Sequence, residues 1–243
     1  MAELAVCLPA HEELRADTVP TFARRAEELG FHSLWSLDRV VYGNLEPLTA
    51  LAAAAAVTSR IRLGISVLLA PLRHPVLLAK VLATLDGLSD GRVTLGMGIG
   101  SRPNDYAALG VPFGRRGRRA EEMIQVMQQV WLGEPVQHQG EFYSVDVGPV
   151  GPRPVQPGGP PLWMGGSAPL VLRRIARLAS GFIARGAAGP HGFAESWEQV
   201  HQYTREVGRD PASLTPASLA YYHVDADEAR ARETATSFIT HFY

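Results

Sequence analysis

Short apolar runs alternate with helical patterns along the whole chain. Continuous apolar runs of four to eight residues indicate buried strands, and apolar residues recurring every three to four positions indicate helices. Strands are predicted at residues 4–8, 33–36, 61–68, 93–97, 162–164, 181–184 and 218–223. Helices are predicted at residues 18–29, 47–58, 75–88, 117–131, 168–178, 193–206 and 225–241. This repetition predicts an α/β fold with a parallel sheet, either a barrel or doubly wound.

Seven strand–helix units leave a closed (β/α)8 TIM-type barrel one unit short. The segment 61–68 is apolar on both faces, as is typical of parallel strands covered by helices on both sides. The chain stops before its last unit, a partner supplies the eighth strand, or the barrel is degenerate. We expect the first, because residues 239–243 end on aromatic side chains without a terminating signal.

A Gly/Pro-rich excursion at residues 133–161 interrupts the repetition. Within it, residues 141–147 are predicted to form a β-hairpin arm, which serves as a lid or an interface element. The remaining pattern is continuous, and single α/β barrels often reach this length. We therefore expect one domain over residues 1–243.

Composition excludes several classes of protein. The 23 basic and 24 acidic residues nearly balance, so nothing indicates nucleic-acid or membrane-surface binding. No signal pattern opens the chain, and no apolar run reaches the ~20 residues of a membrane span. The single cysteine, Cys7, excludes an internal disulfide and is expected to be a small buried hydrophobe. These features predict a cytoplasmic protein.

Common catalytic and metal motifs are absent from the sequence. The eight histidines form no His-x-x-x-His pair, and no carboxylates show ligand spacing, so no metal site is expected. There is no Gly-x-Ser-x-Gly nucleophile elbow. The segment Gly96-Met-Gly-Ile-Gly100 lacks the third glycine of the dinucleotide fingerprint.

Two groups of glycines follow predicted strands. Gly96, Gly98 and Gly100 let the backbone turn sharply and approach a flat or anionic ligand. Gly165 and Gly166 precede Ser167 at a helix start, where amide N–H groups and a hydroxyl suit a phosphate. The structural alternative is a tight turn with Ser167 as a plain N-cap. The functional interpretation is a barrel rim that holds a phosphorylated ring cofactor or, in an unrelated barrel enzyme, a substrate phosphate.

The chain resembles the luciferase-like flavin-dependent monooxygenases, a family that includes oxidoreductases using coenzyme F-420. The resemblance runs nearly end to end. Its landmarks are residues 30–38 (GFHSLWSLD), 58–64 (TSRIRLG), 74–75 (HP), 84–92 (TLDGLSDGR) and 165–167 (GGS). It implies a (β/α)8 barrel with the flavin across the C-terminal rim, a small organic substrate, a separate flavin reductase and a homodimer. Family members usually continue through an eighth strand and helix.

The resemblance also implies roles for rim residues. Ser66 and Val67 fall where relatives carry a non-prolyl cis peptide behind the central ring of the flavin, and Gly98, Gly165, Gly166 and Ser167 line the same cofactor site. Relatives often have Asp-His where this chain has Asp38 and Arg39, and an arginine cannot act as a base near neutral pH. Arg39 could stabilise an anionic reduced flavin, oriented by Asp38. A buried structural ion pair is the alternative.

Three further residues are candidates at the same rim. Tyr106 is placed to stack beside the cofactor and Arg102 to meet its phosphate or the substrate, unless Asn104 and Asp105 simply cap a helix. His74 is a candidate catalytic residue, although a lone histidine is more often a packing residue. The basic run at residues 115–119 is either a solvated helix start or a contact for the polyglutamate tail of F-420.

The first functional hypothesis is a monooxygenase that uses reduced FMN and O2 on a small organic substrate. The first alternative is an F-420-dependent oxidoreductase that transfers a hydride. An alternative of another class is a flavin-binding barrel without turnover, which the missing eighth unit and the Asp-Arg departure favour.

Overall fold

Seven strands run in parallel through the molecule, in the order β1-β2-β3-β5-β8-β9-β10, and the short β4 pairs with β5. The computed structural model describes residues 3–9 and 15–242. The strands are β1 (Ala5–Cys7), β2 (Ser33–Ser36), β3 (Arg62–Ile65), β4 (Leu68–Leu69), β5 (Val93–Gly98), β8 (Leu162–Gly165), β9 (Gly181–Ala184) and β10 (Thr215–Ser218). Within the described residues β1 and β10 form the two edges, so the sheet is an incompletely closed barrel that lacks an eighth unit.

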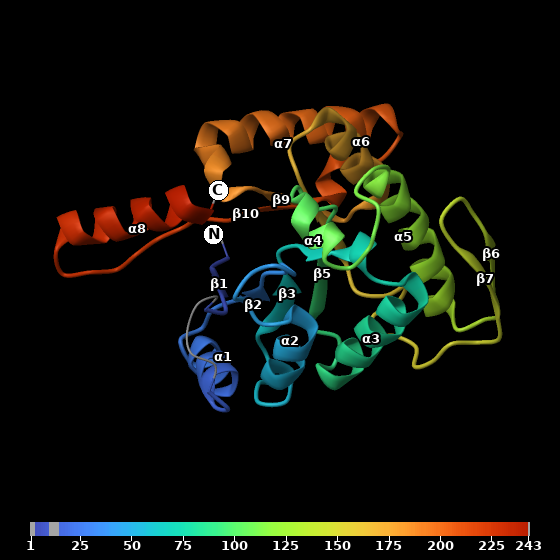
Figure 1. Ribbon diagram of the computed structural model, residues 1–243, viewed down its shortest axis with the longest axis horizontal. Coiled ribbons are helices and arrows are strands. Elements are labelled where there is room, and N and C mark those ends of the chain that lie inside the picture. The colour runs from blue at the N-terminus through green and yellow to red at the C-terminus, as the bar shows by residue number, and fades with distance from the viewer. Residues whose placement is uncertain (1–2, 10–14, 243) are drawn as a thin grey trace.

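Helices cover the outer face of this sheet (Figure 1). They are α1 (Thr18–Glu28), α2 (Pro47–Ala55), α3 (Pro75–Leu88), α5 (Arg116–Leu132), α6 (Pro169–Leu178) and α7 (Gly189–Glu206), whereas α8 (Glu228–Phe242) does not lie over the sheet. The shorter helices are α4 (Pro103–Ala107) and the 3-10 turns η1 (Ala70–Leu72), η2 (Gly186–Ala188) and η3 (Pro211–Ser213). Figure 1 shows α8 projecting from one side of the molecule, beyond the edge strand β10.

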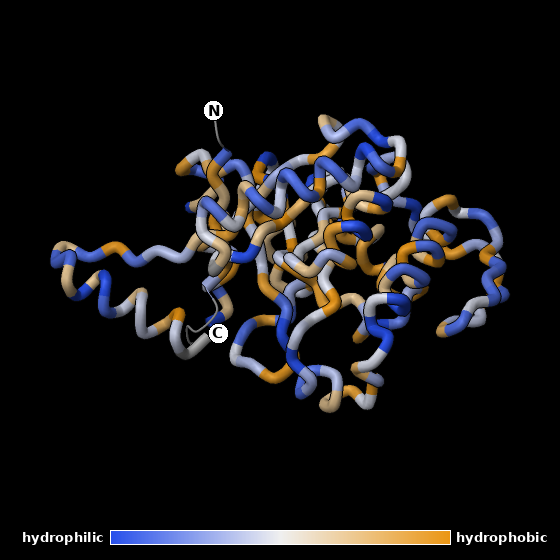
Figure 2. Tube along the Cα trace, turned by 90° about the horizontal axis from the view of Figure 1, so that it is seen from above, coloured by the Kyte–Doolittle hydropathy of each residue, from blue (hydrophilic) through white to orange (hydrophobic). Residues whose placement is uncertain are grey.

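The hydrophobic core lies between the sheet and the helices, and Figure 2 shows hydrophobic residues concentrated along the central strands. Leu34, Leu63, Leu95 and Phe182 are almost fully buried there. Successive strand residues point to opposite faces, so their neighbours point into the barrel. This alternation places leucines on the outer face of the sheet and other residue types inside the barrel.

Two tryptophans and their facing glycines fill the barrel interior. The rings of Trp35 and Trp163 lie 5.5 Å apart. A Cβ atom on Gly64 would lie 2.4 Å from the Trp35 ring, and one on Gly181 would lie 2.5 Å from the Trp163 ring. Glycine is required at both positions because each faces a tryptophan on the neighbouring strand.

The predicted fold class is confirmed, with differences in strand position, among them the division of the strand predicted at 61–68 into β3 and β4. The last strand was expected at 218–223 but is β10, which contains Pro216 and ends at Ser218. Proline is tolerated on an edge strand, whereas the more apolar run after it is irregular. The expected hairpin is present as antiparallel β6 (Val136–Gln139) and β7 (Ser144–Val147), so residue 141 lies in its turn.

Two other expectations need correction. Cys7 is exposed rather than buried, because β1 is an edge strand with a neighbour on one side only. The helix α4 was not predicted, since it has only five residues, beginning at Pro103. Among the described residues, no helix combines the length and the apolar character needed to cross a bilayer.

Candidate functional site

The candidate site lies at the C-terminal ends of the parallel strands, where the loops after β2, β3, β5 and β8 meet. Catalytic residues of α/β barrels lie at this end, because each strand delivers its following loop to the same rim. The loops bring together residues 36–42, 66–67, 98–106 and 165–168 of this chain.

Val67 forms the floor of this rim. The Ser66-Val67 peptide bond is cis, as the family resemblance predicts. A Cβ atom on Gly98 would lie 2.4 Å from Cγ2 of Val67, and one on Gly165 would lie 3.2 Å from its Cγ1. The valine therefore reaches from β5 to β8 by contacting two residues that lack side chains. We call Val67, Gly98 and Gly165 the Val67 shelf.

The loop after β8 leads from the shelf to the start of α6. Gly166 has a φ of +146°, and a Cβ atom there would lie 2.7 Å from Cγ1 of Val171, so glycine is required. The N-cap of α6 is Ala168, without a side-chain cap. Ser167 is exposed and is not the N-cap, so the capping alternative is wrong. Pro169 has no N–H, so donors at this helix end are the amides on either side of Pro169 and the Ser167 hydroxyl.

Asp38 and Arg39 do not pair with each other. Asp38 Oδ2 lies 2.6 Å from a terminal nitrogen of Arg73 and also accepts the Leu69 N–H at 2.8 Å. The expectation that Asp38 orients Arg39 is therefore wrong, since Arg73 reaches Asp38 from the segment that follows η1. Burial lowers the pKa of Arg73, but hydrogen bonds and charges from Asp38 and Glu46 outweigh it and leave that pKa raised.

Arg39 pairs instead with Asp105 of α4. Its Nε lies 2.9 Å from Asp105 Oδ2, and both side chains are largely buried. Asp105 Oδ1 also accepts the N–H groups of Val40 at 3.0 Å and Val41 at 2.8 Å. Arg39 thus forms the buried ion pair that was the structural alternative, but with Asp105 instead of Asp38. This ion pair fixes the loop after β2 to α4.

The remaining residues of the β5 loop also differ from expectation. The N-cap of α4 is Arg102, so neither Asn104 nor Asp105 caps this helix. Tyr106 is 1% exposed, donates its hydroxyl to the Ile99 carbonyl at 2.5 Å, and packs edge-on against Phe113. Burial raises the pKa of Tyr106 to about 12. Stacking of Tyr106 beside a rim cofactor is therefore a wrong prediction, because its ring is enclosed.

Arg102 lies on the same side of the rim as Arg39. Both guanidinium charges oppose the effect of burial on Tyr42, whose pKa nevertheless stays raised. The Arg39 guanidinium carbon lies 5.1 Å from the centre of the Tyr42 ring. Arg39 and Arg102 therefore both lie near enough to Tyr42 to act on its hydroxyl, and the charge of Arg39 is itself paired with Asp105.

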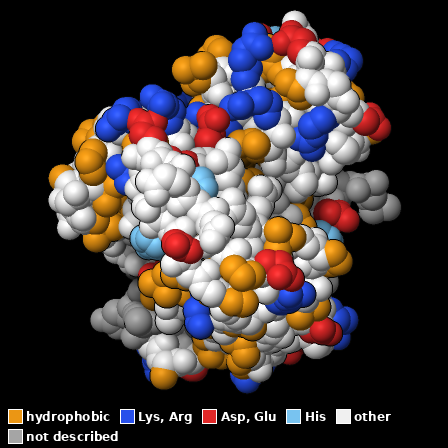
Figure 3. All heavy atoms as spheres, turned by 90° about the vertical axis from the view of Figure 1, so that its right-hand side faces the viewer, with side chains coloured by type: hydrophobic (Ala, Val, Ile, Leu, Met, Phe, Trp, Pro, Cys, Tyr) orange, Lys and Arg blue, Asp and Glu red, His pale blue; other side chains and the backbone are white. Residues whose placement is uncertain are grey.

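His74 and the basic run at 115–119 lie beside the hairpin. His74 is exposed at the N-cap of α3 and packs edge-on against Tyr143, which supports the packing alternative. Arg115 and Arg118 pair with Glu141 of the hairpin turn, and Figure 3 shows Lys and Arg side chains gathered over the upper part of this face. The basic run is thus an exposed helix start, as one of the two alternatives predicted, and it pairs with an acidic residue of the hairpin.

Sequence reasoning missed Arg73 and Arg116. Arg73 neutralises Asp38, and Arg116 donates to the Gly100 carbonyl at 3.0 Å while lying over Phe113. No spacing connects either arginine with its partner along the chain, so only the folded structure reveals them. Among the described residues, no group of His, Cys, Asp and Glu side chains is placed to hold a metal ion.

Known proteins resemble the chain over nearly its full length. An F-420-dependent glucose-6-phosphate dehydrogenase of Beutenbergia cavernae is 38% identical over 88% of this chain and 66% of its own. The 5,10-methylenetetrahydromethanopterin reductase of Methanopyrus kandleri is 29% identical over 95% of this chain and 70% of its own. The crystal structure of the monooxygenase RslO1 from Streptomyces bottropensis matches with a TM-score of 0.84 at 25% identity, over 97% of this chain and 76% of that one.

The family comparison agrees with the barrel fold. A model of the luciferase-like monooxygenases matches residues 3–243. The proteins similar to this chain include both reductases or dehydrogenases and monooxygenases. The chain therefore belongs to the luciferase-like monooxygenase family, a family of oxidoreductases with a TIM-barrel fold.

Proposed function

We propose that this protein is an oxidoreductase that holds the ring system of a flavin-type cofactor against the Val67 shelf. The contact of Val67 with Gly98 and Gly165 carries the proposal, because it creates a floor without projecting side chains at the catalytic end of the barrel. A flat ring needs such a floor, and glycine allows close approach of the backbone.

The loop after the shelf supplies the second part of the proposed site. Gly166 and Ser167 stand where an anionic group would meet backbone amides, a hydroxyl and the positive end of α6. FMN and F-420 both carry a phosphate at the end of a ribityl chain that is attached to a flat tricyclic ring, so the residues present fit either cofactor. The cofactor, when bound, supplies the redox chemistry, and the chain supplies binding, orientation and exclusion of water.

Two reactions fit this site. In the first, the rim would hold reduced FMN delivered by a separate reductase, and this cofactor would supply the redox chemistry for oxygenation of a small organic substrate by O2; the match to the monooxygenase RslO1 supports this version. In the second, a hydride passes between F-420 and a substrate. The 38% identity to an F-420-dependent dehydrogenase supports this second version.

Arg39 and Asp38 limit the proton chemistry in both versions. Arg39 cannot accept a proton near neutral pH, and Asp38 is held by Arg73 and the Leu69 N–H. We therefore assign to Asp38 and Arg39 the role of holding the rim loops and their charged groups in place.

An anaerobic titration with reduced FMN and with F-420 tests the proposal. The wild type is expected to bind one of them, and Gly166→Leu is expected to lose at least about 1.4 kcal/mol of binding, a tenfold change. Gly148→Leu is the matched control, because nothing lies within 4 Å of a Cβ atom at Gly148. Equal affinities in both variants would remove the loop from the site.

Oxygen uptake separates the two reactions. Substrate-dependent consumption of O2 is expected only for the FMN version. Turnover that is unchanged without oxygen identifies the F-420 version. Tight cofactor binding without turnover across a broad substrate panel would instead establish the flavin-binding barrel without catalysis.

We also propose a homodimer through α2 and α3. Leu77 and Leu88 of α3 are each more than half exposed on its outer surface. Sedimentation equilibrium is expected to give twice the chain mass, and Leu77→Glu with Leu88→Glu is expected to give the single chain mass.

A further inference from the structure

A cavity lies on the outer side of the sheet, between α5 and α6. It has a volume of about 240 Å³. Its floor includes Leu95 of β5 and Leu162 at the first position of β8, and its edge includes Ser180 just before β9. These residues lie toward the N-terminal ends of β8 and β9. The cavity is therefore at the opposite end of these strands from the Val67 shelf.

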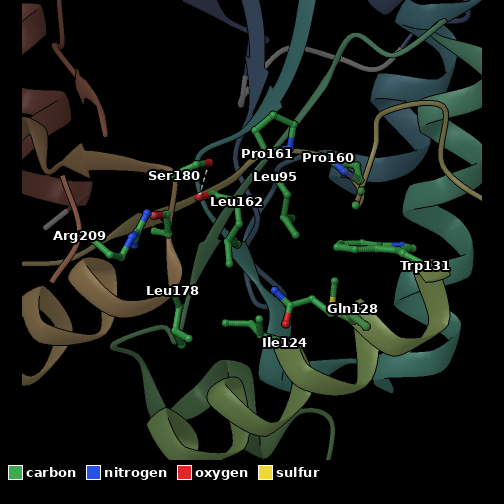
Figure 4. Close-up of a pocket in the computed structure, with 14 residues that line it drawn as sticks. Leu95, Ile124, Gln128, Trp131, Pro160, Pro161, Leu162, Leu178, Ser180 and Arg209 are labelled. Atoms are coloured by element: carbon green, nitrogen blue, oxygen red, sulfur yellow. Dashed lines mark hydrogen bonds between the residues drawn. The ribbon is translucent and has the colours of Figure 1, made fainter. Parts of the chain in front are cut away.

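The walls of this cavity are mainly apolar. Figure 4 shows Leu95, Leu162 and Trp131 pointing into one space, with Ile124 and Leu178 below it. The Trp131 N–H already donates to the Ala79 carbonyl at 3.0 Å, so the indole offers the cavity an apolar ring. The wall at residues 158–161 comes close, since a Cβ atom on Gly159 would lie 2.2 Å from the Trp131 ring.

The size of the cavity restricts its ligand. Drug-sized ligands occupy pockets of roughly 300–1,000 Å³, whereas an apolar cavity of about 150 Å³ accepts benzene. A space of about 240 Å³ lies between these limits and fits a fused pair of aromatic rings. The flat Trp131 ring on one wall favours an aromatic ligand, since aromatic pairs gain energy beyond the area they bury.

A positive charge stands at the other side of the cavity. One terminal nitrogen of Arg209 donates a hydrogen bond to the Ala176 carbonyl at 2.8 Å, and the other terminal nitrogen donates to the Ala179 carbonyl at 2.9 Å. Within residues 3–9 and 15–242 the structure records no carboxylate in an ion pair with Arg209. Because the two carbonyls accept only two of the five N–H groups of this guanidinium, the Nε–H and further N–H groups can donate to another acceptor. Figure 4 shows Arg209 across the cavity from Trp131.

We propose that this cavity binds a small aromatic carboxylate. The ring lies between Trp131 and the leucines, and the carboxylate accepts hydrogen bonds from Arg209. Arginine and carboxylate match in geometry, and a charged hydrogen bond is roughly twice as strong as a neutral one. The Gln128 amide, which reaches toward the cavity from α5, adds a second polar contact. This site is separate from the redox site and stands without it.

Calorimetric titration with 2-naphthoate and its neutral analogue 2-naphthamide tests the proposal. The wild type is expected to bind 2-naphthoate more tightly than the amide by roughly tenfold, because only the carboxylate meets a guanidinium as an ion. Arg209→Gln is expected to remove this difference and leave the amide within about twofold. Arg205→Gln is the matched control, since Arg205 is an exposed arginine of α7 that pairs with Glu198.

Two more variants keep the test decisive if Arg209→Gln fails to fold. Arg209→Lys retains the charge and is expected to retain the preference for 2-naphthoate. Leu178→Phe adds volume inside the cavity and is expected to abolish binding of both probes. The proposal is overturned if 2-naphthoate does not bind at millimolar concentration, if both probes bind alike, or if folded Leu178→Phe binds like the wild type.

Discussion

Arg39 and Asp105 join two rim loops that are 66 residues apart in sequence, through a 2.9 Å contact between Nε and Oδ2. The same carboxylate holds the N–H groups of Val40 and Val41. The shape of a rim segment that the sequence predicted to be catalytic thus depends on a buried ion pair. This distinction governs what substitutions at the rim should change.

Arg39→Ala is expected to lower the free energy of unfolding by about 3 kcal/mol, because it leaves the Asp105 carboxylate buried without its cation. Chemical denaturation measures this change. Arg25→Ala is the control, since Arg25 forms an exposed pair with Glu28 that should contribute less than about 1 kcal/mol. A loss at Arg39 no larger than that at Arg25 would show that the ion pair does not hold the loops.

Gly64→Ala is expected to destabilise the barrel by about 1–3 kcal/mol, because the new methyl group would overlap the Trp35 ring. Gly87→Ala in α3 is the matched control. Nothing lies within 4 Å of a Cβ atom at Gly87, and alanine is favoured over glycine in a helix by about 1 kcal/mol. The midpoint temperature of thermal unfolding should therefore fall for Gly64→Ala and rise for Gly87→Ala. Shifts of the same sign would contradict the packing of Trp35 on Gly64.

Glu122 should make the attachment of the hairpin sensitive to acid. Burial raises the pKa of Glu122, but the N–H groups of Tyr143 and Phe142 and the His138 side chain outweigh it and leave that pKa lowered. A carboxylate whose pKa is lower in the folded state than in the unfolded state stabilises the fold at pH values above its unfolded-state pKa. That contribution is lost as the pH falls through the ordinary glutamate value of 4.5 and then through the lower folded value.

Amide hydrogen exchange of residues 136–147 between pH 3 and pH 6 measures this effect, after correction for the intrinsic pH dependence of exchange. Protection in the wild type should fall at the acid end of the range. Glu122→Gln should show weak protection throughout, whereas Glu134→Gln should behave like the wild type because Glu134 is exposed. Acid-independent protection in the wild type would show that this carboxylate does not secure the hairpin.

The sequence predicts elements well where a single local signal decides. The strands at 33–36 and 181–184 match the structure to the residue, because each is a short apolar run bounded by turn signals. The strand at 218–223 was misplaced because Pro216 argues locally against a strand, although an edge position tolerates it. Local patterns thus fail where the position within the sheet decides.

Site residues depend even more on tertiary contacts. The glycines at 98, 165 and 166 were predicted as positions of close backbone approach, and a Cβ atom at each would indeed meet a neighbouring side chain, whereas their contact with a cofactor stays a prediction. The partners of Asp38 and Arg39 were not found, because Arg73 and Asp105 lie far along the chain. Tyr106 was placed at the rim because its type suits stacking, while its burial is decided by Phe113 and Ile99.

The most direct test of the central claim is a crystal structure of the protein with FMN or F-420 bound. Our account predicts the ring system in contact with Val67, Gly98 and Gly165, and the phosphate at the amides of Gly166 and Ser167. A cofactor bound elsewhere on the molecule, with the Val67 shelf free of it, would contradict the account.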